Sequence, residues 1–162
     1  EIAKWFMENR ELSRQLQQIE YLFQRTSHAS SYDIEIQAHW AKYLCILCAG
    51  FLENSISELY IEYVRGKAAP PIANYAISSL GKIHNPKTQK FLEVAATFDR
   101  KWESELQDFV DSNNRSEAID SIMNNRHLIA HGKQSGVTIA PLENWFGKAL
   151  EVVEFIEAQT KR

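Results

Sequence analysis

One arginine and two histidines near residue 130 carry the side chains in this sequence that are best suited to chemistry. They lie in the segment 124–132, which reads Asn-Asn-Arg-His-Leu-Ile-Ala-His-Gly, and they are Arg126, His127 and His131. An arginine stays charged and can bind phosphate oxygens with two donors at once. A histidine changes charge near neutral pH and is therefore suited to acid or base catalysis. Together these residue types favour a small basic site that handles a phosphate group.

The residues around this segment have the apolar spacing of an amphipathic helix, which we expect over residues 115–130 with Gly132 just past its end. Arg126 falls on the same apolar stripe as Ile119, seven positions earlier. A charge on such a stripe must be paired, or must face a cleft or a partner subunit. The buried stripe continues with Ile122, Met123 and Ile129, and an adjacent polar side comprises Asp120, Asn124, His127 and His131.

His131 is expected in the last helical turn, where the unpaired carbonyls and the negative end of the helix dipole favour a protonated imidazole. On an ideal helical wheel Arg126 and His131 lie about 140° apart, which is not one face. A long guanidinium can still swing toward a histidine at a helix end, so a shared phosphate site is compatible with the spacing. An arginine and a histidine at this spacing more often only cap a helix or face solvent on its surface, because such short motifs occur by chance.

Two other groups of ligand-type residues are less specific. His127 and His131 are four residues apart, as in some zinc sites, but residue 128 is leucine where a metalloprotease helix has glutamate, and no third ligand suggests itself. Cys45 and Cys48 have CxxC spacing within an apolar helical run and without a second cysteine pair, which predicts buried thiols. We therefore expect no metal and no cofactor. A glycine-rich phosphate loop is missing, so nothing supports an NTPase.

Hydrophobic residues recur every three or four positions through almost the whole chain, which predicts an all-α bundle of five or six helices. The second helix is expected to be the longest and most buried. It is expected to start near residue 31, where Ser30 and Asp33 have capping-box spacing, and to stop near Arg65-Gly66, since Pro70 and Pro71 forbid its continuation. Asn85 is the expected N-cap of a later helix. The remaining helical segments are expected over residues 5–23, 71–80, 85–110, 115–130 and 142–156. The segment 85–110 is expected with or without a break near Asp99. Residues 137–140 are expected to be briefly extended.

Length and charge limit the classes of protein to consider. The chain has 162 residues, which fits one domain over residues 1–162, and 18 Lys and Arg stand against 21 Asp and Glu. A net charge of −3 argues against a surface coated by nucleic acid but allows a local basic site. The longest uncharged apolar run, over residues 43–52, is about half of what a spanning helix needs, and no secretory pattern opens the chain. We therefore expect a cytoplasmic protein without a membrane segment.

Arg126-His127-x-x-x-His131 resembles the Arg-(Asn or His)-x-x-x-His motif of the HEPN superfamily, the higher eukaryotes and prokaryotes nucleotide-binding domains. The long second helix with acidic Glu53 and the late helix that ends at the motif before Gly132 are also similar to that family. A final amphipathic helix containing Trp145-Phe146 extends the resemblance over most of the chain. Only the six-residue motif is specific. The variant is similar to bacterial HEPN proteins of the RiboL-PSP, abortive-infection and toxin-like types.

The resemblance implies metal-independent cleavage of RNA, in which a 2′-hydroxyl attacks the adjacent phosphorus and leaves a 2′,3′-cyclic phosphate. It implies that His131 is the acid or base, that Arg126 stabilises the phosphorane, and that His127 assists or orients. Asn125 is a supporting residue, and Glu53 is the expected partner of Arg126. The family also implies a homodimer in which two motifs face one cleft, and it makes an antitoxin protein a candidate partner. The alternative is a catalytically inert HEPN-like module that binds RNA, a nucleotide or a protein.

Overall fold

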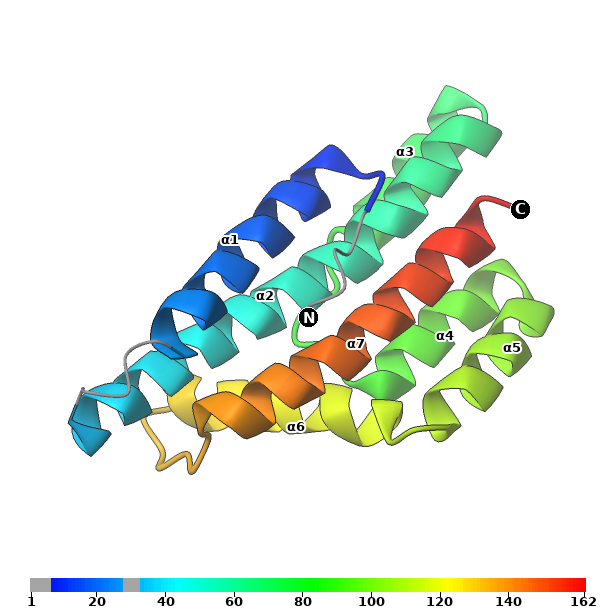
Figure 1. Ribbon diagram of the computed structural model, residues 1–162. Coiled ribbons are helices and arrows are strands. Elements are labelled where there is room, and N and C mark those ends of the chain that lie inside the picture. The colour runs from blue at the N-terminus through cyan, green and yellow to red at the C-terminus, as the bar shows by residue number, and fades with distance from the viewer. Residues whose placement is uncertain (1–6, 28–32) are drawn as a thin grey trace.

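The computed structural model describes residues 7–27 and 33–162. They form an all-α bundle of seven helices (Figure 1). The helices are α1 (Arg10–Ser27), α2 (Ile34–Lys67), α3 (Pro70–Leu80), α4 (Thr88–Phe98), α5 (Arg100–Asp111), α6 (Arg115–Ala130) and α7 (Ile139–Thr160). The all-α prediction is confirmed.

The expected count of five or six helices was too low, because the segment 85–110 is broken at Asp99. The backbone of Asp99 is extended, with φ −156° and ψ 125°, which interrupts the helical path. Its carboxylate accepts a hydrogen bond from the Lys101 N–H at 2.8 Å and so caps a new helix. Asp99 therefore ends α4 and starts α5.

Two predicted helix starts were misplaced, by three residues at α2 and by two at α4. Helix α2 begins at Ile34 with Asp33 as its N-cap, whereas Ser30, the predicted capping residue, lies outside the described residues. Helix α4 begins at Thr88 with Lys87 at the N-cap position rather than Asn85. Asn85 instead adopts a left-handed backbone with φ 50°, a conformation that asparagine tolerates in turns. Ile139 and Ala140, expected to be extended, already belong to α7.

Helix α2 is the central helix, as expected, and packs against α1, α3, α6 and α7. Figure 1 shows α1 and α7 beside α2, while α4 and α5 form a hairpin next to α7. The start of α2 and the end of α6 lie at the same end of the bundle, near the loop that leads into α7. The contact of the Cys45 Sγ with the Ile122 carbonyl oxygen, at 3.6 Å, fixes the level at which α2 meets α6.

By length and composition α2 is also apolar enough to span a membrane, so the expectation that no stretch reaches that length was wrong. Its apolar window is 61% buried inside the bundle. A helix of this kind is apolar because it faces other helices on several sides, as the core helix of a soluble protein does.

Candidate functional site

The end of α6 places the two histidines of the motif on the surface. The left-handed Gly132, with φ 64°, turns the chain away from the helix. The Lys133 N–H donates to the Leu128 carbonyl at 2.8 Å, and the Gly132 N–H donates to the Ile129 carbonyl at 3.1 Å. These two bonds form a Schellman motif in which His131 is the C-cap residue. The prediction of a helix over residues 115–130 that is closed by Gly132 is confirmed, while His131, expected in its last turn, follows the helix as the C-cap residue.

His127 and His131 form a pair on this end of the helix. Their ring centroids are 4.4 Å apart and the rings are inclined by 55°, with both residues exposed. The pKa of His127 lies below its usual value. Partial desolvation by neighbouring groups is the largest cause, although the residue as a whole is exposed, and nearby positive charges add to it. These charges belong to His131, Lys133, Lys87 and Arg126.

Arg126 is half-buried, so it occupies the edge of the apolar stripe rather than its fully buried centre. Ile119, on the preceding turns, is completely buried. Within residues 7–27 and 33–162 the Arg126 guanidinium makes no hydrogen bond and no ion pair. A half-buried guanidinium without an anionic partner is available to an anion supplied from outside the chain.

Asn125 fastens the loop that follows the motif. Its side-chain amide donates to the Ser121 carbonyl at 2.9 Å, and its Oδ1 accepts a hydrogen bond from the Ser135 hydroxyl at 2.8 Å. The Ser135 Oγ in turn accepts from the Val137 N–H at 3.3 Å. Ser135 is only 8% exposed, so these bonds are largely shielded from water. The loop 132–138 is therefore tied to α6 at Asn125, six residues before His131.

Glu53, expected beside Arg126, contacts a different part of the chain. Its Oε2 accepts a short hydrogen bond from the Asn85 N–H, and its Oε1 lies 3.6 Å from the His84 Nδ1. In this structure Glu53 therefore holds the segment between α3 and α4, and no ion pair joins it to Arg126 within the described part of the chain.

Two lysines complete the basic site, and the sequence pattern did not single them out. Lys133 follows the motif directly, and its position is set by the Schellman motif. Lys87 comes from another element and is brought to α6 by its neighbour Thr88, whose N–H donates to the Asp120 Oδ1 at 2.8 Å. That contact joins residues 32 positions apart, so no local pattern could have revealed it. The site is thus locally basic in a chain of net negative charge.

Metal-ligating side chains do not gather at this site. No group of three or more His, Cys, Asp or Glu side chains with metal-binding geometry occurs among residues 7–27 and 33–162. Cys45 and Cys48 are free, buried thiols, as predicted. Burial raises the pKa of Cys45 to about 12, so its thiolate is inaccessible near neutral pH.

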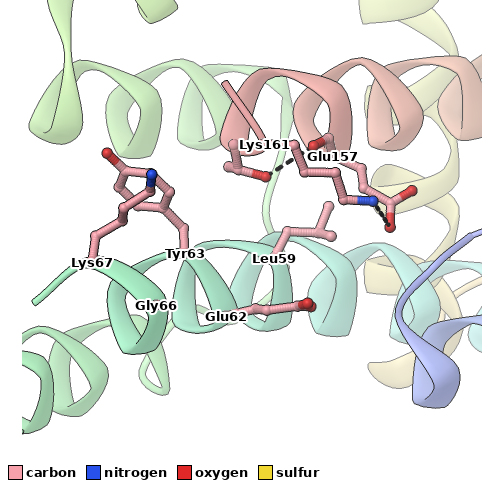
Figure 2. Close-up of a pocket in the computed structure, with 8 residues that line it drawn as sticks. Leu59, Glu62, Tyr63, Gly66, Lys67, Glu157 and Lys161 are labelled. Atoms are coloured by element: carbon pink, nitrogen blue, oxygen red, sulfur yellow. Dashed lines mark hydrogen bonds and ion pairs between the residues drawn. The ribbon is translucent and has the colours of Figure 1, made fainter.

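A cavity of about 160 Å³ opens at the other end of the bundle, between the last turns of α2 and α7 (Figure 2). Figure 2 shows Lys161 directed toward Glu157 there, and the two groups form an ion pair at 3.3 Å. Glu157 also accepts a hydrogen bond from the Glu8 N–H at 3.1 Å. These charges are used to attach the N-terminal segment and the end of α7 to the bundle, and the cavity is remote from the histidine pair.

Comparison with known proteins gives one family match. A family model described as RiboL-PSP-HEPN matches residues 8–162, which is nearly the whole chain and includes the histidine pair. No curated protein and no solved structure gives a significant match.

Proposed function

The chain belongs to the RiboL-PSP-HEPN family, and from this membership we propose that it is a metal-independent endoribonuclease. HEPN domains include ribonucleases and nucleotide-binding modules, so family membership alone leaves the activity open. The observation that carries the proposal is the exposed His127–His131 pair, 4.4 Å between ring centroids. The positive charge of Arg126 acts on His127, and its guanidinium has no hydrogen bond or ion pair within the described residues. Proton-transfer groups near a cation are what phosphodiester cleavage requires.

In the proposed reaction the RNA 2′-hydroxyl attacks the adjacent phosphorus and the 5′-oxygen of the next nucleotide departs. A base removes the proton of the 2′-hydroxyl, and an acid protonates the departing oxygen. The products are a 2′,3′-cyclic phosphate and a free 5′-hydroxyl. Every bond and proton is accounted for by RNA and imidazole groups, so the scheme needs no metal and no cofactor.

We assign the main acid–base role to His131 and charge stabilisation to Arg126. His131 caps the helix next to the left-handed Gly132, where the ring is exposed to an incoming strand. Arg126 presents several donors to the equatorial oxygens of the phosphorane. His127, whose pKa is lowered, is mostly neutral at pH 7 and is able to accept a proton or a hydrogen bond beside His131. Asn125 supports the site by holding the loop that carries Lys133.

The test is an RNase assay on single-stranded RNA in the presence of EDTA, with analysis of the product ends. Wild type is expected to yield 2′,3′-cyclic phosphate ends, and His131→Ala to lose activity by about 100-fold or more, the range typical of acid–base groups. His39→Ala is the matched control, because His39 is an exposed histidine on α2. Activity that vanished with chelator and returned with a divalent metal would contradict the mechanism.

For the biological role we propose a cytoplasmic toxin of a toxin–antitoxin or phage-defence system, or an RNA-processing enzyme. A nuclease with an exposed site needs control in the cell, and an antitoxin protein would supply it. Expression of wild type in a bacterial host is expected to arrest growth, while His131→Ala is tolerated at the same soluble level. Equal growth of both strains would count against the toxin role.

A second proposal is a catalytically inert HEPN-like module that binds RNA, a nucleotide or a protein partner. It is favoured by one observation: apart from their mutual ring contact, neither histidine side chain has a hydrogen-bond partner among the described residues. Acid–base histidines are commonly oriented by a further group. RNA that is bound by wild type but never cleaved would support this alternative.

A further inference from the structure

The segment that leads into α4 is anchored on both sides of Lys87. Before it, the Asn85 N–H donates to Glu53 on α2. After it, the Thr88 N–H donates to Asp120 on α6 at 2.8 Å, and the Thr88 hydroxyl donates to the Ser116 carbonyl at 3.0 Å. Thr88 itself is buried. The backbone of Lys87 is therefore held in place against α6 by contacts that do not involve its own side chain.

The Lys87 side chain extends from this fixed backbone into solvent. It is exposed and makes no hydrogen bond and no ion pair within residues 7–27 and 33–162. The carboxylates of Asp120 and Glu53 accept hydrogen bonds from the N–H groups of Thr88 and Asn85 and form no ion pair with Lys87. The Lys87 ammonium group therefore has no ion-pair partner within the described residues.

Lys87 and the histidine pair are aligned on one side of α6. Asp120, Asn124, His127 and His131 follow one another at spacings of four, three and four residues, which keeps them on the same helical face. Lys87 lies next to Asp120, the first residue of this row. His131 is the last, and at 1.5 Å per residue it lies about 16 Å further along the helix axis. The positive charge of Lys87 is one of the causes that lower the pKa of His127, which lies between Asp120 and His131 on this face.

We propose that Lys87 binds a phosphate of the RNA strand that neighbours the cleaved phosphate, so that the site takes an extended polynucleotide rather than an isolated phosphodiester. This inference rests on the proposed ribonuclease function. The cleaved phosphate lies at Arg126 and His131, and the strand runs along the exposed face of α6 toward the start of α4. Lys87 contributes to the binding of the strand and takes no part in proton transfer.

The experiment compares Lys87→Ala with Lys90→Ala on two substrates. Lys90 is a matched control because it is exposed on the first turn of α4 and already pairs with Glu93 at 3.2 Å. The substrates are a uridine dinucleotide, which contains only the cleaved phosphate, and a fluorescent hexauridine. On the hexamer, Lys87→Ala is expected to lower kcat/KM about three- to tenfold, mainly through KM, and to reduce the salt slope by about 0.7, the value for one lost phosphate contact on a single strand.

On the dinucleotide, at a pH above the usual pKa of histidine, where His127 is neutral with or without Lys87, Lys87→Ala is expected to match wild type. Lys90→Ala is expected to match wild type on both substrates. Equal kinetics of the two variants on the hexamer would overturn the inference. An equal loss by Lys87→Ala on both substrates would also overturn it, because the lysine would then act at the cleaved phosphate or on the fold.

A binding measurement separates this inference from the proposed catalysis. In a His131→Ala background, fluorescence anisotropy with the uncleaved hexamer is expected to give a Kd about three- to tenfold weaker when Lys87 is also replaced by alanine. If Lys87→Ala weakens binding but wild type never cleaves RNA, the proposed ribonuclease activity is contradicted and the proposed Lys87 contact is still supported. A wild type that neither binds nor cleaves the hexamer would overturn both.

Discussion

The imidazole ring centroids of His127 and His131 lie 4.4 Å apart at the C-terminal end of α6, and the rings are inclined to each other by 55°. Two positive charges at this distance repel, so protonation of one ring disfavours protonation of the other. Repulsion from His131 is one of the causes that lower the pKa of His127. A reaction that needs both a proton acceptor and a proton donor has two imidazole rings side by side in this arrangement.

The first prediction concerns the titration of His127. Its pKa is expected to lie below 6.5 in the folded protein, through desolvation and the neighbouring charges of His131, Lys133, Lys87 and Arg126. Removal of one of these charges in His131→Gln or Lys87→Ala is expected to raise that pKa toward the usual value. The measurement is a pH titration of the imidazole signals by NMR, with the His39→Gln variant as a control that leaves the His127 titration unchanged. No shift in either variant would contradict the proximity of these charges.

The same lowered pKa has a consequence for stability. Between the folded and the unfolded pKa of His127, the unfolded chain binds more protons than the folded one, so this residue favours unfolding as the pH falls through about 6.5. This destabilisation of the folded state is complete below the pKa of His127 in the folded protein and is absent above about pH 7. The exposed position of His127 means that solvent weakens the effect.

The second prediction concerns Arg126. Arg126→Ala is expected to lower cleavage by about 100- to 1000-fold, the cost of losing one charge-stabilising group in a transition state. The folded state should keep its thermal midpoint, because Arg126 has no hydrogen bond or ion pair within the described residues. Arg126→Lys is expected to remain impaired, since a point charge does not reproduce the two-pronged contact of guanidinium. Activity and circular dichroism melting are measured together. A lysine variant as active as wild type would show that only charge matters there.

The third prediction concerns the contact between Asn125 and the loop after α6. Asn125→Ala removes the bond from the Ser135 hydroxyl and the bond to the Ser121 carbonyl, and is expected to cost about 1–2 kcal/mol of unfolding free energy. The released loop carries Lys133, so kcat/KM should fall as well. The neighbouring Asn124→Ala is the matched control, because Asn124 is exposed and its side chain has no hydrogen bond within the described residues. Denaturant unfolding and kinetics of both variants would decide, and equal stability would refute the contact's importance.

The elements that carry the site could be predicted from local sequence, because their boundaries depend on nearby residues. Helix α6 begins and ends where the spacing predicted, since the turn at Asn113 and Asn114 precedes it and Gly132 closes it. Misplaced helix starts have a local cause too. A capping-box spacing at Ser30 and an Asn-Pro pair at Asn85 are good signals, but Asp33 and Lys87 occupy the cap positions in the folded chain.

The partners of the site residues could not be predicted, because they depend on contacts between distant segments. Glu53 was assigned to Arg126 from its place on the second helix, yet its carboxylate contacts His84 and Asn85, which a one-dimensional pattern does not reveal. Lys87 reaches α6 only because Thr88 bonds to Asp120. The motif itself is local, whereas the charge that surrounds it is a property of the packing of α4 on α6.

The last prediction concerns oligomeric state. A half-buried arginine without an anionic partner is costly unless it opens onto a cleft, and a second subunit would provide the other wall of that cleft. We expect a symmetric homodimer whose shared groove contains Arg126 and His131 of both subunits. Light scattering at assay concentration is expected to give twice the mass of the chain. Co-refolding of two inactive variants, Arg126→Ala and His131→Ala, is expected to restore a fraction of the activity, because a mixed dimer supplies each group once. A monomer with full activity would contradict the shared groove, as would a mixture no more active than either variant alone.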